Sequence, residues 1–304
     1  MKNNNENQYD NSIIEEDSAV KVIVNPYNFN NKLITEDDVK KILQAYDIND
    51  DINDLSLYQK AFIHNSYSKK NPLDIGEDVT IADKPEGALE LFDYDSETLE
   101  FLGDSVLGVI VAKYLFERFP EEQEGFLTKM RSKLVRGEML GSLAKMLNFG
   151  EFLILSRHIE DKCDGRNSVS ILEDSFEAFL GAMFLDFNET DNYNLMENFY
   201  SGIGYQICEK FIIHFIEDKV DFADLIRRNT NYKEQLMRYF KEKYEQLPRY
   251  GQISVEGSLN EKVYTMCVYD PEGNVLETGV GQSKKKAEQI AAKNILLKAG
   301  IIDK

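Results

Sequence analysis

The spacing of apolar residues divides the chain into two parts. From Thr35 to about residue 187, apolar positions recur every three or four residues, which is the period of a helix with one buried face. Thr35, followed directly by three acidic residues, is typical of a helix N-cap. The helical stretches are Val39–Tyr46, Leu57–Phe62, Leu99–Phe119, Phe126–Leu147 and Ile171–Phe187. This pattern predicts that the first two thirds of the chain are all-α.

After Thr230 the pattern changes to that of a mixed module. One helix is predicted first, then three short segments of alternating apolar and polar residues, then a closing helix. These elements are expected at Lys233–Tyr244, near Gln252–Glu256, at Val263–Tyr269, at Val275–Val280 and from Ser283 onward. We therefore predict a multidomain chain, an all-α domain followed by an α+β domain of order α-β-β-β-α.

Two segments lack sustained periodicity. Residues 1–30 are rich in Asn and carry an acidic stretch, so we expect a disordered tail. Residues from about 69 to 95 belong to an acidic stretch before the first strong helix, so we expect a flexible insertion there. The predicted domains are accordingly residues 31–225, which contain the insertion, and residues 226–304.

Length and composition are typical of an intracellular protein with two domains. A chain of 304 residues, 42% of them hydrophobic, can bury one large and one smaller core. It has no apolar run near the length of a membrane span, and its start lacks the apolar region of a secretory signal. Three scattered cysteines favour reduced thiols over disulfides. We expect a soluble intracellular protein without membrane partners.

Charge is unevenly distributed along the chain. The formal net charge is -19, the opposite of what a nucleic acid attracts. Residues 231–304, however, hold 12 Lys and Arg against 10 Asp and Glu, whereas residues 1–230 hold 23 against 44. The acidic excess therefore lies upstream of the α+β module.

Three acids share one face of the predicted helix that follows Ser96. At 100° per residue, Glu97, Glu100 and Asp104 fall within about 60° of one another. The opposite face is apolar and predicted to be buried, with Leu99, Leu102, Val106, Val109 and Ile110. Such a stripe alone is most often an ordinary solvated face.

A second helix with the same design strengthens the pattern. Asp174 and Glu177 lie three residues apart on one face, and Gly181 beside them leaves room for a backbone, a metal or a phosphate. If the two helices pack face to face, four or five carboxylates meet, and hard cations would have to neutralise them. Because no Cys or His joins the set, zinc is disfavoured, and hydrolysis assisted by one or two Mg²⁺ ions is expected.

The two acidic motifs also resemble those of a known family. ETLEFLGDSVL resembles the signature of ribonuclease III, and EDSFEAFLGAMFLD resembles its second acidic motif, with EGFLTKMRSKLV between them and HNSY upstream. The resemblance implies a double-strand-specific endoribonuclease that processes RNA and leaves 5′-phosphate and 3′-hydroxyl ends with short 3′ overhangs. Mg²⁺ is the implied cofactor, with Mn²⁺ able to substitute.

The resemblance also implies roles for individual residues. It makes Glu100, Asp104, Asp174 and Glu177 the catalytic, metal-coordinating acids and gives Glu97 and Glu124 supporting roles. Ser96 and Thr98 depart from the residues common in the family, and neither departure touches the four acids.

Phe101 lies on the acidic face rather than on the apolar one, so its ring needs a cover. The cover is either a loop of the same chain or, as the resemblance implies, a socket on the second subunit of a homodimer.

Some candidates have two interpretations. His64 in the HNSY motif is favoured as a packing and hydrogen-bonding residue, because hydrolysis by metal-activated water needs no imidazole. Arg131, Lys133 and Arg136 lie on a predicted helix that either faces RNA phosphates or is simply solvated.

The last module resembles a double-stranded-RNA-binding domain. In GVGQSKKKAEQIAAKNIL, Ser283 can cap a helix whose first turn presents Lys284 and Lys285 to phosphates. In GSLNEKVY, Asn260 and Lys262 match a loop that enters the RNA minor groove, which is recognised by shape and 2′-hydroxyls. Three other positions, Met237, Arg238 and Glu288, depart from the family pattern and predict modest, salt-sensitive binding.

Three functions are compatible with these observations. The leading hypothesis is an active dimeric endonuclease that cuts double-stranded RNA. The alternatives are a catalytically inactive double-stranded-RNA-binding or structural protein on the same fold, and a helical acidic scaffold for protein partners. Retention of all four acids disfavours the first alternative, and the strand-rich C-terminal module disfavours the second.

Overall fold

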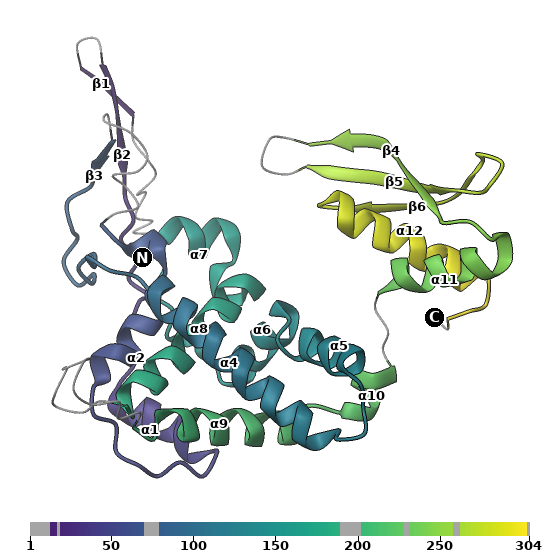
Figure 1. Cartoon of the computed structure of the whole chain (residues 1–304). Coiled ribbons are helices and arrows are strands. Elements are labelled where there is room, and N and C mark those ends of the chain that lie inside the picture. Colours follow the sequence, from purple (N-terminus) through teal and green to yellow (C-terminus); the bar gives the residue numbers. More distant parts are fainter. Residues whose placement is uncertain are drawn as a thin grey trace, which may run out of the picture. The chain divides into compact units, whose positions relative to one another are not determined.

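The computed structural model describes residues 13–16, 19–69, 79–188, 202–227, 231–257 and 262–302. They belong to two compact units, residues 1–221 and residues 222–304 (Figure 1). The division after Asp221 falls four residues before the predicted start of the second domain at residue 226.

The first unit is dominated by helices. It contains α1 (Glu36–Gln44), α2 (Leu55–Ala61), α4 (Glu97–Arg118), α5 (Glu124–Leu134), α6 (Gly137–Met146), α7 (Arg157–Cys163), α8 (Val169–Asp186), α9 (Gly204–Lys219) and three short 3₁₀ turns, Asn65–Tyr67, Phe149–Glu151 and Gly165–Asn167. Thr35 caps α1 in a capping box with Asp38, as its sequence predicts. The continuous helix expected over Phe126–Leu147 is divided, because Arg136 adopts an extended backbone. Among the described helices, none is both long and apolar enough to cross a bilayer.

Helix α8 is the centre of the first unit. It packs against α2, α4, α6 and α9. Its buried face carries Phe176 and Phe179, which contact the rings of Phe149 and Phe211 at centroid distances of 5.0–6.4 Å. Large aromatic side chains bury much apolar surface and pack in few arrangements. The aromatic core therefore fixes α8 from behind and leaves its other side to face α4.

Three strands lie where the sequence pattern predicts no regular structure. β1 (Ile13–Glu16) pairs antiparallel with β2 (Ala19–Val24), and β2 pairs parallel with β3 (Val79–Ile81). Tyr27 is buried after β2, and Leu91 is buried within the acidic insertion. The described residues of both segments therefore include regular structure, which the sequence pattern does not predict. The pairing of β2 with β3 joins residues far apart in sequence, and such long-range pairing leaves no local signal.

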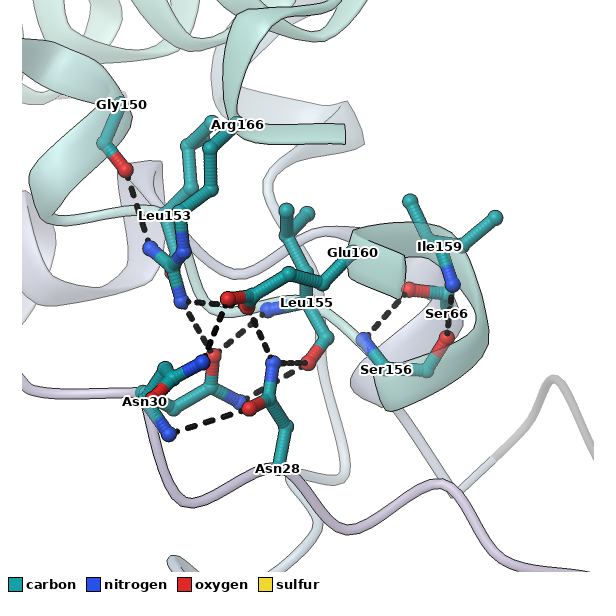
Figure 2. A network of polar contacts seen from close by, with 11 residues as sticks. Asn28, Asn30, Ser66, Gly150, Leu153, Leu155, Ser156, Ile159, Glu160 and Arg166 are labelled. Carbon is teal, nitrogen blue, oxygen red and sulfur yellow. Dashed lines mark hydrogen bonds and ion pairs between the residues drawn. The ribbon is translucent and has the colours of Figure 1, made fainter. Parts of the chain in front are cut away.

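A polar network attaches the segment after β2 to the body of the first unit (Figure 2). Asn28 and Asn31 donate side-chain hydrogen bonds to the carbonyl of Leu155, at 3.2 and 2.9 Å, and the Leu155 N–H donates back to Asn31 at 3.0 Å. Glu160 accepts from Asn28 and forms an ion pair with Arg166 at 2.9 Å. Arg166 in turn donates to two main-chain carbonyls between residues 150 and 153. Residues 150–156 are thus held from two sides.

The second unit has the predicted α-β-β-β-α order, preceded by a short helix, α10 (Phe222–Arg227). Its elements are α11 (Tyr232–Tyr244), β4 (Arg249–Glu256), β5 (Val263–Tyr269), β6 (Val275–Gly281) and α12 (Lys284–Lys298). The strands form an antiparallel sheet in the order β4-β5-β6. Leu236 and Phe240 of α11, Val268 of β5 and Leu296 of α12 share one core. The helices therefore cover one face of the sheet (Figure 1).

Candidate active site

Helices α4 and α8, which carry the predicted acids, pack against each other (Figure 1). Along the side of α4 opposite the acids, Leu99, Val106 and Ile110 are buried as predicted, and Leu102 is partly buried. Val109 is 58% exposed, so its predicted burial is wrong. It lies at the edge of the apolar arc, where a small rotation of the helix decides exposure.

Two glycines allow the α4 and α8 backbones to touch. A Cβ atom on Gly103 would lie 1.8 Å from the carbonyl oxygen of Glu177, and one on Gly181 would lie 2.2 Å from that of Leu99. Any side chain at either position would force the helices apart. The space that the sequence reserves at Gly181 is therefore filled by the α4 backbone. This close crossing brings the acids of the two helices together.

The acids of the two helices act on one another electrostatically. Burial raises the pKa of Glu177 to about 8, with further contributions from Asp104, Glu173, Glu100 and Asp174. Burial likewise raises the pKa of Glu100 to about 7. The negative charges of Asp174, Glu97, Glu173 and Asp104 add to the effect. Desolvation and like charges both disfavour the ionised form. The four catalytic candidates therefore belong to one electrostatic cluster.

Glu173 belongs to this cluster and was not among the predicted site residues. Its pKa is raised by burial and by the charges of Asp174 and Asp104. Its carboxylate lies against Gly137, where a Cβ atom would be 2.0 Å from Oε2. At 100° per residue, Glu173 is turned away from Asp174 around the helix axis, so helical geometry alone does not predict that Glu173 joins the cluster. Two sequence features could have indicated that Glu173 belongs to the site: its position next to Asp174, and the glycine at the start of α6.

In the described part of the chain, the cluster lacks a basic partner. Among the described residues, no Lys, Arg or His forms a salt bridge with Glu100, Asp104, Asp174 or Glu177. Within the same residues, no three His, Cys, Asp or Glu side chains already converge enough to hold a metal ion. The donor set fits a hard divalent cation, because carboxylate oxygens are its preferred ligands and added positive charge would lower the raised pKa values. Closure around such an ion requires side-chain movement.

Glu97 and Glu124 have different surroundings. Glu97 accepts a hydrogen bond from the side chain of Asn65 at 2.9 Å and lines a pocket with Glu100 and Asp174. Glu124 begins α5, is exposed, and accepts from Thr128 at 2.7 Å. It is not among the charges that raise the pKa of Glu100 or Glu177. Within one chain, the structure brings Glu97 to the cluster and leaves Glu124 outside it.

Phe101 is 79% exposed on α4, and exposed apolar side chains continue along the helix at Val109 and Phe116. A loop of the same chain was one interpretation of its cover. The described residues supply no such loop, because the ring remains open to solvent. An uncovered apolar stripe of this kind is typical of an interaction surface.

In the second unit, the helix start predicted to meet RNA is formed as expected. Ser283 caps α12 by accepting from the Lys286 N–H at 3.2 Å, and Lys284 and Lys285 are exposed in its first turn. Lys262 is exposed directly before β5, and Asn260 lies outside the described residues.

The departures from the RNA-binding pattern are partly compensated. Glu288 forms an ion pair with Lys233, so its negative charge is neutralised within the unit. Arg238 pairs with Glu234 on the same helix, whereas Met237 is exposed. Glu288 therefore ties α12 to α11 rather than facing solvent as a free charge.

Comparison with known proteins supplies the deciding observations. Residues 97–188 match the ribonuclease III domain, and residues 232–298 match the double-stranded RNA binding motif. Ribonuclease 3 of Lactococcus lactis subsp. cremoris is 34% identical over 244 residues, which cover 80% of this chain and 90% of that protein. This chain belongs to the ribonuclease III family. The predicted family and the predicted order of the two domains are thereby confirmed.

Other members of the ribonuclease III family show the same likeness over different spans. A probable ribonuclease 3 of Acanthamoeba polyphaga mimivirus is 33% identical over 274 residues, or 88% of this chain, and the chain spans 46% of that relative's length. The solved nuclease domain of ribonuclease III from Campylobacter jejuni is 26% identical, with a TM-score of 0.44, and the match covers 61% of this chain and 97% of that one. The family relationship confirms the expectation of a ribonuclease III-type endoribonuclease with an RNA-binding domain.

Proposed function

We propose that this chain hydrolyses phosphodiesters of double-stranded RNA in an Mg²⁺-dependent reaction. The products would have 5′-phosphate and 3′-hydroxyl ends with short 3′ overhangs, and the activity would serve RNA processing. One observation carries the proposal: Glu100 and Glu177 have raised pKa values within a cluster of acids that has no basic partner among the described residues. Perturbed acids in a partly buried cluster are typical of a catalytic site.

In this proposal, Glu100, Asp104, Asp174 and Glu177 hold the divalent cation. Mg²⁺, or Mn²⁺ in its place, supplies when bound the positive charge that activates a water and stabilises the leaving 3′ oxygen. The crossing at Gly103 and Gly181 supports this assignment, because it fixes the two pairs of acids relative to each other. Glu97, which accepts a hydrogen bond from Asn65, lines a pocket with Glu100 and Asp174 and would act as a supporting acid.

We further propose that the chain acts as a homodimer through its nuclease domain. Phe101 would insert into a socket on the second copy, and Glu124, which lies outside the cluster of its own chain, would line the shared RNA-cleavage valley in a supporting role. Burying an exposed Phe contributes roughly 1.5–3 kcal/mol. Phe101→Ala should therefore weaken dimerisation at least tenfold in sedimentation measured over a range of low concentrations. An unchanged dissociation constant would remove Phe101 from the interface.

RNA would be held by the second unit through Lys284 and Lys285 at the start of α12 and through Lys262 and Asn260 of the β4–β5 connection. The exposed lysines of a capped helix start support the first contact, because backbone N–H groups there already favour anions.

The decisive experiment is cleavage of a long RNA duplex by the purified full chain, in Mg²⁺, in Mn²⁺ and in EDTA. The expected result is discrete short products in the presence of either metal, with 3′ overhangs and 5′ ends that phosphatase treatment makes available for labelling. Binding without cleavage under every metal condition would instead favour the catalytically inactive RNA-binding protein.

A further inference from the structure

The HNSY turn forms part of the wall of the acidic pocket. His64 and Asn65 line this pocket together with Glu97, Glu100 and Asp174. The acids in this wall are hydrogen-bond acceptors when ionised, as are the phosphate oxygens of RNA. Asn65 already donates to Glu97. A further donor in this wall would match the chemistry of a bound phosphate.

The hydrogen bonds of His64 determine which ring nitrogen carries the proton. Nδ1 accepts from the backbone N–H of Ser66 at 3.1 Å, which requires a lone pair on that nitrogen. The Ser66 hydroxyl lies 2.8 Å from the same nitrogen. It itself accepts from the Ser156 N–H at 3.1 Å (Figure 2), so its own proton can point to Nδ1. The proton of the neutral imidazole is therefore on Nε2.

The turn that carries His64 is held rigidly. The His64 N–H donates to the Ile154 carbonyl at 3.1 Å, and the Ile154 N–H donates to the Phe62 carbonyl at 2.8 Å. Ser156 caps α7 through the Ile159 N–H (Figure 2). Residues 150–156 are in turn fixed by the Asn28, Asn31 and Arg166 network. The ring therefore has one orientation relative to the acids.

Nε2 is available for a ligand. Among the described residues it has no hydrogen-bond partner, and it is not a sealed buried atom. Burial lowers the pKa of His64, which keeps the ring neutral with one proton. The ring therefore presents a single fixed donor at this nitrogen.

We propose that His64 donates its Nε2–H to a phosphate oxygen of the bound RNA beside the bond that is cleaved. The interaction rests on the proposed RNA cleavage and adds a substrate contact to it. His64 then has two separable functions: Nδ1 fixes the turn, and Nε2 contacts the substrate. The packing and hydrogen-bonding role that the sequence favours for His64 corresponds to the first function, at Nδ1.

Two substitutions separate these functions. His64→Asn retains an acceptor that can cap the Ser66 N–H but places no group at the Nε2 position. His64→Gln loses this cap but can place an amide N–H near the Nε2 position. A contact to a charged phosphate predicts that His64→Asn lowers kcat/KM by roughly 10- to 100-fold, whereas His64→Gln stays within about threefold of the wild type. A purely structural role predicts the opposite order.

The measurement uses the full chain, a defined RNA duplex and saturating Mg²⁺, with melting temperatures recorded for each variant. If the wild type does not cleave, the proposed function fails. If it cleaves and His64→Asn cleaves equally well, only the His64 contact fails. If His64→Asn is slow merely because it melts early, Gln should be slower still, which would also overturn the contact.

A duplex with 2′-fluoro nucleotides around the cleavage site identifies the acceptor. Donation to a phosphate oxygen predicts the same ratio of wild-type to His64→Asn rates on this duplex as on unmodified RNA. Loss of the ratio on the fluorinated duplex would overturn the phosphate assignment, because it would place the contact on the 2′-hydroxyl.

Discussion

Three acidic side chains of the RNA-binding unit are paired with a base, whereas the four catalytic candidates on α4 and α8 have no basic partner among the described residues. The second unit contains the ion pairs Lys233–Glu288, Arg238–Glu234 and Lys298–Glu277. Even on the outside of the nuclease unit, Lys113 pairs with Glu117 and Glu209. The catalytic candidates therefore stand out because Glu100 and Glu177 are partly buried among other acids without a basic partner in the described part of the chain. A cluster that the chain leaves unneutralised is complementary to an external cation.

The strongest test of this contrast removes one acid. Glu177→Gln is expected to reduce cleavage in Mg²⁺ by about 1,000-fold or more, because the cation loses a charged ligand. Binding of the same duplex, measured in a gel-shift assay, should change by less than about twofold, since the second unit is untouched. Glu122→Gln, an exposed acid between α4 and α5, is the matched control and should be fully active. Normal cleavage by Glu177→Gln would remove this residue from the mechanism.

The helix crossing can be broken without touching a charge. Gly103→Ala is expected to destabilise the nuclease unit by roughly 1–3 kcal/mol, because its Cβ would collide with the Glu177 carbonyl. On the same helix, a Cβ on Gly108 would meet nothing within 4 Å. Gly108→Ala should therefore be neutral or stabilising by up to about 1 kcal/mol. Thermal melting compares the pair, and equal melting temperatures would contradict the close crossing.

The RNA-binding unit provides the reciprocal test. Replacing both Lys284 and Lys285 by Ala should weaken duplex binding roughly tenfold and reduce the slope of log affinity against log salt by about 2. The cleavage rate at saturating RNA should stay close to that of the wild type. Lys298→Ala, an exposed lysine at the opposite end of α12, serves as the control. An unchanged salt dependence would show that the start of α12 does not contact phosphates.

The smallest expected effect is a pH-dependent stability. The folded chain holds protons on Glu100 up to about pH 7 and on Glu177 up to about pH 8, whereas an unfolded Glu releases its proton near 4.5. In EDTA, the contribution of these two carboxyl groups to stability is therefore fully present below about pH 4.5. It is lost as the pH rises through 7 and 8.

Mg²⁺ should restore melting at pH 8.5 by roughly 2–4 °C and have little effect at pH 6, where protons compete with the cation. Melting of the full chain at the two pH values, with and without Mg²⁺, checks this expectation. In Glu177→Gln, the melting temperature should differ less among these four conditions than it does in the wild type. A Mg²⁺ effect that is independent of pH would contradict the coupling between these carboxyl groups and the cation.

Local pattern was sufficient for the helices and for the α-β-β-β-α order. Val39 and Leu43 are buried where the helical period places them, and Ser283 begins a helix as its cap predicts. The pattern failed where partners are distant in sequence, and it also missed the local pairing of β1 with β2. Pairing of β2 with β3 joins residues more than fifty positions apart, and Tyr27 is buried by such long-range contacts.

The candidate site was predictable to the extent that one helix defines it. The arc of Glu97, Glu100 and Asp104 follows from helical geometry, and so does the exposure of Phe101. Glu173 was missed because its proximity to Asp104 depends on how two helices pack. The tautomer of His64 was equally invisible, since it depends on Ser66 and on the chain around Ser156.

The contact between Gly103 and Gly181 has a consequence for protein engineering. Because main chain meets main chain there, the separation of the acids is set by two helix axes and does not depend on intervening rotamers. The two helices can thus be transplanted as one block into another helical scaffold, provided that both glycines move together. Grafting either helix alone would lose the spacing that brings the acids of the two helices into one cluster.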